Sequence, residues 1–238
     1  MKKTIISLSL LISLSSCADL QHVVNQIPTN TTNGISLTNA DIAAGLREAL
    51  NLGIEKQVSN LTQTDGFYKN ELVKIVLPEE LQQVDKALRK IGLGNLADEG
   101  IKALNRAAED AVKEATPIFV DAVKGITFND AKAILLGNNT AATDYLTAKT
   151  ETQLYTKFNP VIQQSFSKVG ADKIWNTLIT KYNNIPFTTK VNPDLTDYVT
   201  DEALEGVYTM IAVEEQTIRE SVSERSTELL KRVFALQD

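Results

Sequence analysis

The stretch that decides the fold runs from Asn105 to Tyr145 and reads NRAAEDAVKEATPIFVDAVKGITFNDAKAILLGNNTAATDY. Its first part is rich in alanine and carries apolar residues at helical spacing as far as Gly125. Thr127-Phe128-Asn129-Asp130 resembles a capping box, with Asp in place of the usual Glu, and Gly137 ends the helix that this box opens. The stretch therefore predicts an alanine-rich helix, a capped second helix and the start of a third.

Helical spacing continues on both sides of this stretch. We expect the alanine-rich helix to span 95–124, with a kink at Pro117, and to be the central helix because alanines let neighbours approach closely. The other helices are expected at 38–60, 79–91, 140–169 with a break at Pro160, 171–183, from the cap Thr200 onward, and 226–236.

One segment is ambiguous. Residues 71–78 (ELVKIVLP) are β-branched and roughly alternating, so they predict a short strand that pairs with 187–191 (FTTKV). Helical segments far outnumber such strands. The fold class is therefore all-α or nearly so: a multi-helix bundle around a central Ala-rich helix, with one short two-stranded element.

Composition excludes several chemistries. The chain has one Cys, at position 17, and one His, at position 22, both ahead of the expected domain. Disulfides, Cys/His zinc sites, Cys nucleophiles and Ser-His-Asp triads are therefore not expected in the domain. The net charge of −6, with no basic cluster, argues against nucleic acid. Nucleotide-binding and hydrolase motifs are absent from the sequence, so we predict no cofactor and no metal site.

The first residues have the pattern of a targeting signal. Lys2 and Lys3 precede an apolar run, TIISLSLLISL, that is too short to span a bilayer. The run ends in Leu14-Ser15-Ser16-Cys17, which resembles the bacterial lipobox. That resemblance implies that residues 1–16 are a signal peptide and that Cys17 is acylated, for example with palmitate, and anchors the chain. Ala18 after Cys17 favours the outer membrane, with the protein facing the periplasm.

The sequence from Cys17 onward predicts two further parts. Residues 17–38 hold the lipidated Cys and a polar, turn-rich tether, in which His22 is a solvated linker residue. Residues 39–238 form a single helical domain.

Glu215 is the polar residue whose position indicates a specific role most clearly, because it falls on the apolar stripe of its helix. The stripe is Leu204, Tyr208, Ile211, Glu215, Ile218. A buried carboxylate needs a partner, and Arg219 lies four residues on in the favourable order, with Arg225 in reach from the next turn. We interpret Glu215 as half of a structural ion pair. The alternatives are a ligand-binding or catalytic carboxylate and a surface ion pair.

Five further residues are candidates for a polar seam or ligand site. They lie on the Ala-rich helix or at the starts of the helices that follow it, and each has a structural reading in hydrogen bonding or capping beside the functional one: Asn105, Glu109, Asp130, Thr143, Tyr145. Together with Glu215, Arg219 and Arg225 they form one proposed seam between the central and C-terminal helices, which we interpret as a clasp rather than a site.

A set of short motifs resembles the signature of an exported bacterial family, the domain of unknown function of the 4197 type. The motifs are Asn105-Arg106-Ala107-Ala108-Glu109, Asp130-Ala131-x-x-Ile134-Leu135, Gly137, Ala141-Ala142-Thr143-x-Tyr145, Glu214-Glu215-x-x-Ile218-Arg219 and Arg225-Ser226-Thr227-x-Leu229-Leu230-Lys231-x-Val233-Phe234. The resemblance covers Ala40 to Phe234. It implies a helical, envelope-located domain and brings no established activity. Val222 stands where the family has Pro, and Ser226 where it has Thr.

Two function classes follow. The leading hypothesis is a non-enzymatic lipoprotein, held at the membrane through Cys17, whose domain binds a small or lipidic ligand or an envelope protein, or acts structurally. The alternative is a carboxylate-dependent enzyme acting on an envelope polymer, with Glu215 or Glu109 as the acid. An open cleft with two carboxylates roughly 5–10 Å apart favours the enzyme. Carboxylates that are buried and paired with arginine argue against it.

Overall fold

The computed structural model describes residues 37–90, 92, 94–184, 186, 187, 189–191 and 194–237. From Leu37 onward the chain forms one compact unit. Its helices are α2 (Asn39–Leu61), α3 (Glu79–Lys90), α4 (Gly94–Val112), α5 (Ala115–Lys124), α6 (Phe128–Leu135), α7 (Ala141–Val169), α8 (Ala171–Asn183), α9 (Thr196–Glu220), the 3₁₀ turn η1 (Val222–Glu224) and α10 (Glu228–Phe234). The prediction of an all-α class is confirmed, since no strand occurs among the described residues.

The predicted signal peptide, Cys17, His22 and the tether as far as residue 36 lie outside the described residues.

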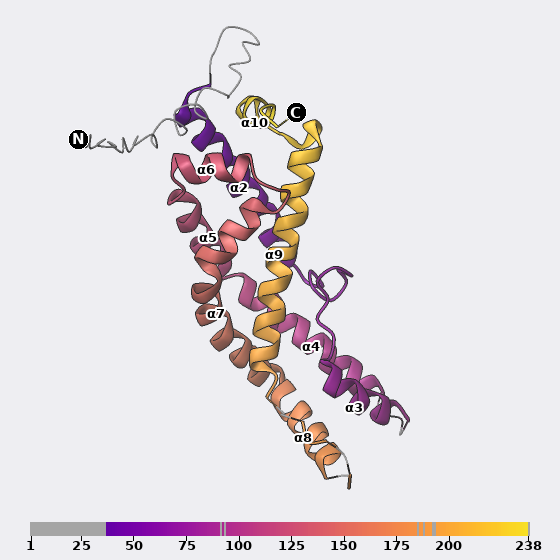
Figure 1. Cartoon of the computed structure of the whole chain (residues 1–238). Helices are drawn as coiled ribbons and strands as arrows, with labels where there is room; N and C mark the ends of the chain where they lie inside the picture. Colours follow the sequence, from indigo (N-terminus) through magenta and orange to yellow (C-terminus); the bar gives the residue numbers. More distant parts are fainter. Residues whose placement is uncertain are drawn as a thin grey trace, which may run out of the picture. The chain divides into compact units, whose positions relative to one another are not determined.

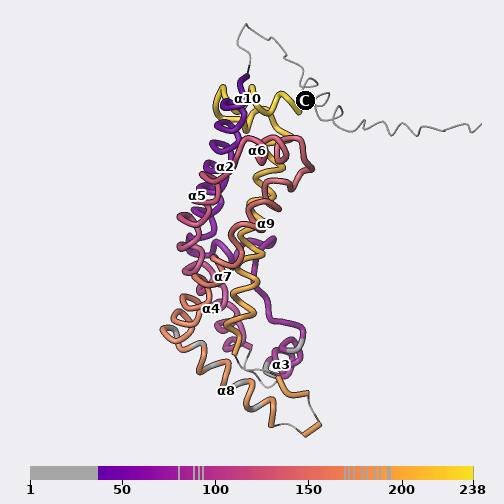
Figure 2. Tube along the Cα trace, turned by 60° about the vertical axis from the view of Figure 1, so that its left-hand side comes forward, coloured from indigo at the N-terminus to yellow at the C-terminus, as the bar shows by residue number. Residues whose placement is uncertain are grey.

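Three long helices, α4, α7 and α9, form the centre of the unit. α7 packs along both α4 and α9, and α2 packs against α5, α6, α9 and α10 (Figures 1 and 2). The helices meet through fully buried side chains, among them Leu104 of α4, Phe158 of α7 and Val207 of α9. Burial of these apolar surfaces is the main stabilising contribution to such a bundle.

The predicted single helix over 95–124 is wrong: the structure has two helices, α4 and α5. The break falls at Lys113 and Glu114, just ahead of Pro117. Pro117 has no N–H to donate to the carbonyl of Lys113, and its ring crowds that carbonyl. The proline therefore ends one helix and begins another rather than kinking a single one.

The predicted break at Pro160 is also wrong, because α7 runs through it as one helix. Pro160 is exposed, so the carbonyl of Thr156 that it leaves without a helical partner is on the solvated side. The opposite side of the helix buries Leu154, Phe158 and Ile162 completely. The helix thus continues with one backbone hydrogen bond fewer on its solvated side.

Two helix boundaries differ from their predictions. α9 begins at Thr196 rather than at Thr200, whose hydroxyl is buried inside the helix and donates to the carbonyl of Thr196 at 2.7 Å. Asp194 accepts a hydrogen bond from the Thr196 N–H at 2.9 Å and so marks the true start. The last helix is the shorter α10, which is capped by the hydroxyl of Thr227.

The predicted two-stranded element is absent from the described residues of 71–78 and 187–191. Residues 74–78 lie outside any helix. The backbone N–H and carbonyl of Ile75 form hydrogen bonds with a side chain and not with a neighbouring strand. Asn105 Oδ1 accepts from the Ile75 N–H at 2.9 Å, and Asn105 Nδ2 donates to the Ile75 carbonyl at 2.8 Å. One carboxamide therefore supplies the two hydrogen bonds that a paired strand provides.

Among the described residues, no helix has the length and apolar content needed to cross a bilayer.

Candidate functional site

Glu215 lies at the start of α7, although it belongs to α9. Its Oε1 accepts from the Ala142 N–H at 2.9 Å, and its Oε2 accepts from the N–H and the hydroxyl of Thr143 at 2.9 and 2.8 Å. Thr140, the residue that precedes α7, makes no side-chain capping bond of its own. Glu215 thus acts as the cap of another helix, where a negative charge is also favoured by the helix dipole.

Arg219 completes this arrangement. Its Nε and Nη2 donate to Glu215 Oε1 at 3.0 and 2.7 Å, which confirms the predicted ion pair. The same guanidinium donates to the carbonyls of Ile134 and Leu135 at the end of α6. One ion pair therefore satisfies the end of α6 and the beginning of α7, and both side chains are about 95% buried.

Arg225 is buried beyond the end of α9, and only 1% of its surface is exposed. It donates to the carbonyl of Ile218 at 3.1 Å and to that of Arg219 at 2.9 Å. Its guanidinium also lies 5.7 Å from the centre of the Phe234 ring on α10. Arg225 therefore caps the C-terminal end of α9 and holds α10 against it, a favourable place for a cation.

Asn105 and Glu109 face a different part of the fold. Both lie on α4, one turn apart, and both are buried. Asn105 holds Ile75, as described above, while Glu109 Oε1 accepts from the Phe67 N–H at 3.2 Å and Oε2 accepts from Arg106 at 2.5 Å. Arg106 also pairs with Asp65. These residues fix the connection between α2 and α3.

Asp130 and Tyr145 are less buried. Asp130 forms the predicted capping box with Thr127, and the backbone N–H of Thr127 holds the pKa of Asp130 below its usual value. Tyr145 is partly buried, with the Lys149 ammonium 5.6 Å from its ring centre. Burial, and then the charge of Asp130, raise the pKa of Tyr145.

The structure thus separates the eight candidates. Thr143, Glu215 and Arg219 form one cluster, with Arg225 on the same helix end. Glu109 belongs to a second cluster with Asp65 and Arg106, whereas Asn105, one turn away on α4, binds Ile75. None of these hydrogen bonds involves Thr143, Glu215 or Arg219.

Sequence reasoning missed Glu214 as a functional candidate. It is buried beside Glu215 and accepts hydrogen bonds from Lys56 Nζ at 2.9 Å and Gln57 Nε2 at 2.7 Å, both on α2. The signal was present, because Glu214 lies three residues after Ile211 and four before Ile218, which is the same helical spacing that singled out Glu215.

A small cavity of ≈ 20 Å³ lies against both carboxylates, and its other walls are mostly aliphatic residues of α2 and α9. This volume holds about one water molecule. Within the described residues, no group of three His, Cys, Asp or Glu side chains is arranged to hold a metal ion. The chemistry of the Glu215 cluster is that of charge-assisted hydrogen bonds between helix ends.

The fold and these contacts define a helical module whose buried charges connect helix termini. The chain matches the family model "Protein of unknown function (DUF4197)" over residues 36–235, and it belongs to that family. Neither a curated protein nor a solved structure matches the chain.

Proposed function

We propose that the chain is a lipoprotein, anchored through Cys17 in the outer membrane of a bacterium, whose helical domain acts in the periplasm as a non-catalytic binding or structural module. The observation that carries the proposal is Leu14-Ser15-Ser16-Cys17 at the end of a short apolar run, with the sole Cys of the chain in the last position. Two or more acyl chains on one residue give stable anchoring, whereas a single chain binds only marginally.

The burial of the charged residues supports a non-catalytic role. Both oxygens of Glu215 are occupied, by α7 and by Arg219, and Arg219 is itself bound to α6. A general acid needs a carboxyl group within reach of a substrate. Glu109 is likewise engaged by Phe67 and Arg106. The alternative of a carboxylate-dependent enzyme therefore gains no support from either cluster.

Metabolic labelling with a fatty acid tests the anchor. Wild type should take up label and remain in the membrane fraction, whereas Cys17→Ser should take up none and move to the soluble fraction. Ser15→Ala is the matched control, because it keeps a small residue in the lipobox, and it should behave as wild type. Equal membrane retention of wild type and Cys17→Ser would overturn the proposal.

A further inference from the structure

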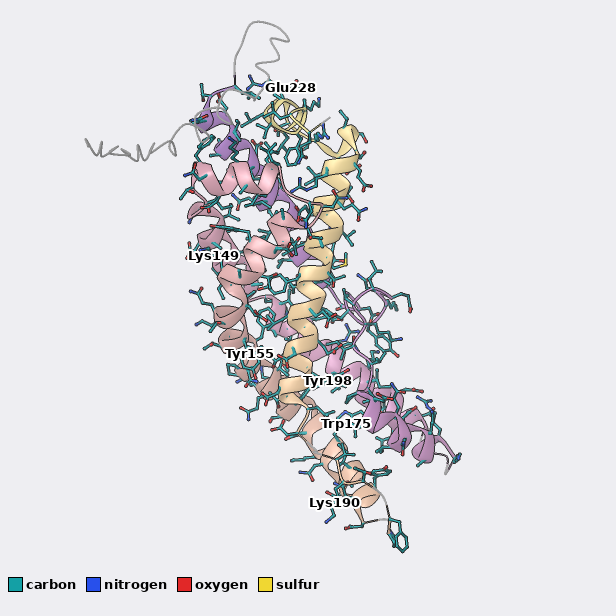
Figure 3. All side chains as sticks on the ribbon, in the orientation of Figure 1. Lys149, Tyr155, Trp175, Lys190, Tyr198 and Glu228 are labelled. Carbon is teal, nitrogen blue, oxygen red and sulfur yellow. The ribbon has the colours of Figure 1, made fainter. Side chains whose placement is uncertain are left out.

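The end of the folded unit that lies opposite α10 is formed by two connections. The chain turns there once between α3 and α4, and again after α8 (Figures 1 and 2). α3 also packs against α8, so both turns belong to the same end. In Figure 3, Lys190 lies at this end, whereas Glu228 of α10 lies at the other. We call this surface the α3–α8 end; its described residues used below are Lys86, Lys90, Phe187 and Lys190.

Phe187 is the most exposed large apolar residue of the described part of the chain. It is 107% exposed, so its ring is as open to water as in an extended peptide. Its backbone has a φ of 66°, a conformation that bulky residues rarely adopt. Backbone of this kind costs free energy and occurs mostly where a function requires it. With the exposed Pro186 beside it, Phe187 presents an aromatic group to the solvent.

A pair of hydrogen bonds joins the two sides of the turn that carries Phe187. Asn183 Nδ2 donates to the Val191 carbonyl at 2.9 Å, and Asn183 Oδ1 accepts from the Val191 N–H at 2.9 Å. Val191 and Tyr182 are partly buried and pack against the core. The base of the turn is therefore fixed to the fold, while the ring of Phe187 projects away from it.

Both turns of the α3–α8 end are basic. Residues 86–97 include three basic residues and no acidic one, and residues 173–193 include three lysines and no acidic one. Arg89 pairs with the two aspartates that flank the first turn, whereas Lys86, Lys90 and Lys190 are exposed. The chain as a whole has a net charge of −6. The fold thus collects positive charge at one end of an acidic protein, from segments that are far apart in the sequence.

We propose that the α3–α8 end binds the surface of a bilayer that contains anionic phospholipid. The ring of Phe187 enters the boundary between headgroups and acyl chains, and the lysines bind the headgroup phosphates. A lipid surface needs no matching shape, which suits a single ring without apolar side chains around it. The rest of this acidic protein is repelled by such a surface, so the contact is confined to the basic end. This inference goes beyond the proposed function and does not depend on Cys17.

Sedimentation with dense vesicles measures this contact for the full chain. The protein is first reconstituted into light phosphatidylcholine vesicles, so that any anchor contributes equally to every variant. Dense, sucrose-loaded vesicles are then added, made of phosphatidylcholine alone or of equal parts phosphatidylcholine and phosphatidylglycerol. We expect the protein to sediment with the phosphatidylglycerol vesicles only, and less of it at high salt, because salt screens the lysines. Flotation of the light vesicles alone shows whether the anchor holds, so the two proposals fail separately.

Two variants remove the groups that make the contact. Phe187→Asn deletes the ring and supplies a residue that tolerates a positive φ, and it should weaken binding to the dense phosphatidylglycerol vesicles about tenfold. Lys190→Gln should weaken the same binding about fivefold, the share of one lysine near an anionic surface.

Matched controls lie elsewhere on the unit. Val222→Ser changes an exposed apolar residue of η1, and Lys149→Gln an exposed lysine of α7; both should bind as wild type does. Thermal melting checks that all four variants fold. No sedimentation with either kind of dense vesicle, equal sedimentation with both kinds, unchanged binding of Phe187→Asn and Lys190→Gln, or equal losses in the controls would overturn the inference.

Discussion

Glu215 accepts hydrogen bonds from both the N–H and the hydroxyl of Thr143, a residue 72 positions earlier in the chain. Glu215 of α9 thus caps the N-terminal end of α7, a role that a residue next to the helix in sequence normally has. The beginning of α7 is stabilised only when α9 lies against it, so the two helices depend on each other for stability as well as for packing.

Replacing Glu215 with alanine should lower the free energy of unfolding by about 3–5 kcal/mol, because Arg219 then remains buried without its partner. Urea denaturation measures the effect. Glu220→Ala on the same helix is the control: Glu220 is exposed, and its loss should change stability by less than about 0.5 kcal/mol. An unchanged midpoint for Glu215→Ala would contradict the capping role and would point to a functional carboxylate instead.

Replacing Asn105 with leucine should leave the N–H and the carbonyl of Ile75 buried without partners, at a cost of about 1–3 kcal/mol for each group. The change should be local. Hydrogen exchange followed by mass spectrometry should show faster exchange around Ile75, whereas Asn51→Leu, at an exposed position of α2, should leave that segment protected. Protection of the Ile75 amide that survives Asn105→Leu would show that another group holds this segment.

Tyr208 should lower the stability of the folded protein at alkaline pH. Burial raises the pKa of its phenol from 10.0 to about 12, and its hydroxyl lies 2.8 Å from that of Thr150. Because the pKa is higher in the folded state, the stability from the neutral phenol is complete below pH 10.0 and is lost as pH rises towards 12. Urea unfolding of wild type and Tyr208→Phe across this range should show a steeper loss in wild type. Parallel pH profiles would contradict the burial of this phenol.

Two glycines should respond to alanine in opposite ways. A Cβ at Gly100 of α4 would lie 2.6 Å from the Trp175 ring, so Gly100→Ala should destabilise by about 1–3 kcal/mol and shift the tryptophan emission. A Cβ at Gly125 has no neighbour closer than 3.4 Å, and the residue has helical angles. Gly125→Ala should therefore stabilise by about 0.4–1 kcal/mol. Thermal denaturation of both variants tests the pair, and equal shifts would refute the close approach of Trp175.

The helices could be predicted because their apolar residues recur with the period of an α-helix and because their caps are local. Thr38 with Asp41, and Thr127 with Asp130, form both capping boxes within four residues of sequence. Prolines were harder to interpret. Pro117 follows a break between two helices, whereas Pro160 lies inside one, although both prolines are exposed and both are flanked by buried apolar residues. A proline can end or merely bend a helix, and the local pattern is the same in both cases.

In the candidate site, too, contacts within one helix could be predicted and contacts between distant segments could not. The Glu215–Arg219 pair was predictable because its residues are one helical turn apart. The partners of Asn105 and Glu109 lie 30 and 42 residues away, and spacing on a single helix cannot indicate such contacts. A cavity beside Trp175 collects residues of α7, α8 and the start of α9, which are far apart in sequence, and no local pattern indicates it.

The hydrogen bonds between Asn105 and Ile75 have a consequence for solubility. Residues 73–77, VKIVL, combine β-branched and apolar side chains with a single charge, a composition that promotes cross-β pairing between molecules. If such a segment left its place in the fold, its unpaired backbone groups would be a template for aggregation. The carboxamide of Asn105 occupies both groups of Ile75 and so denies that position to a second chain. Asn105 therefore keeps this segment in the fold and limits self-association of the protein through it.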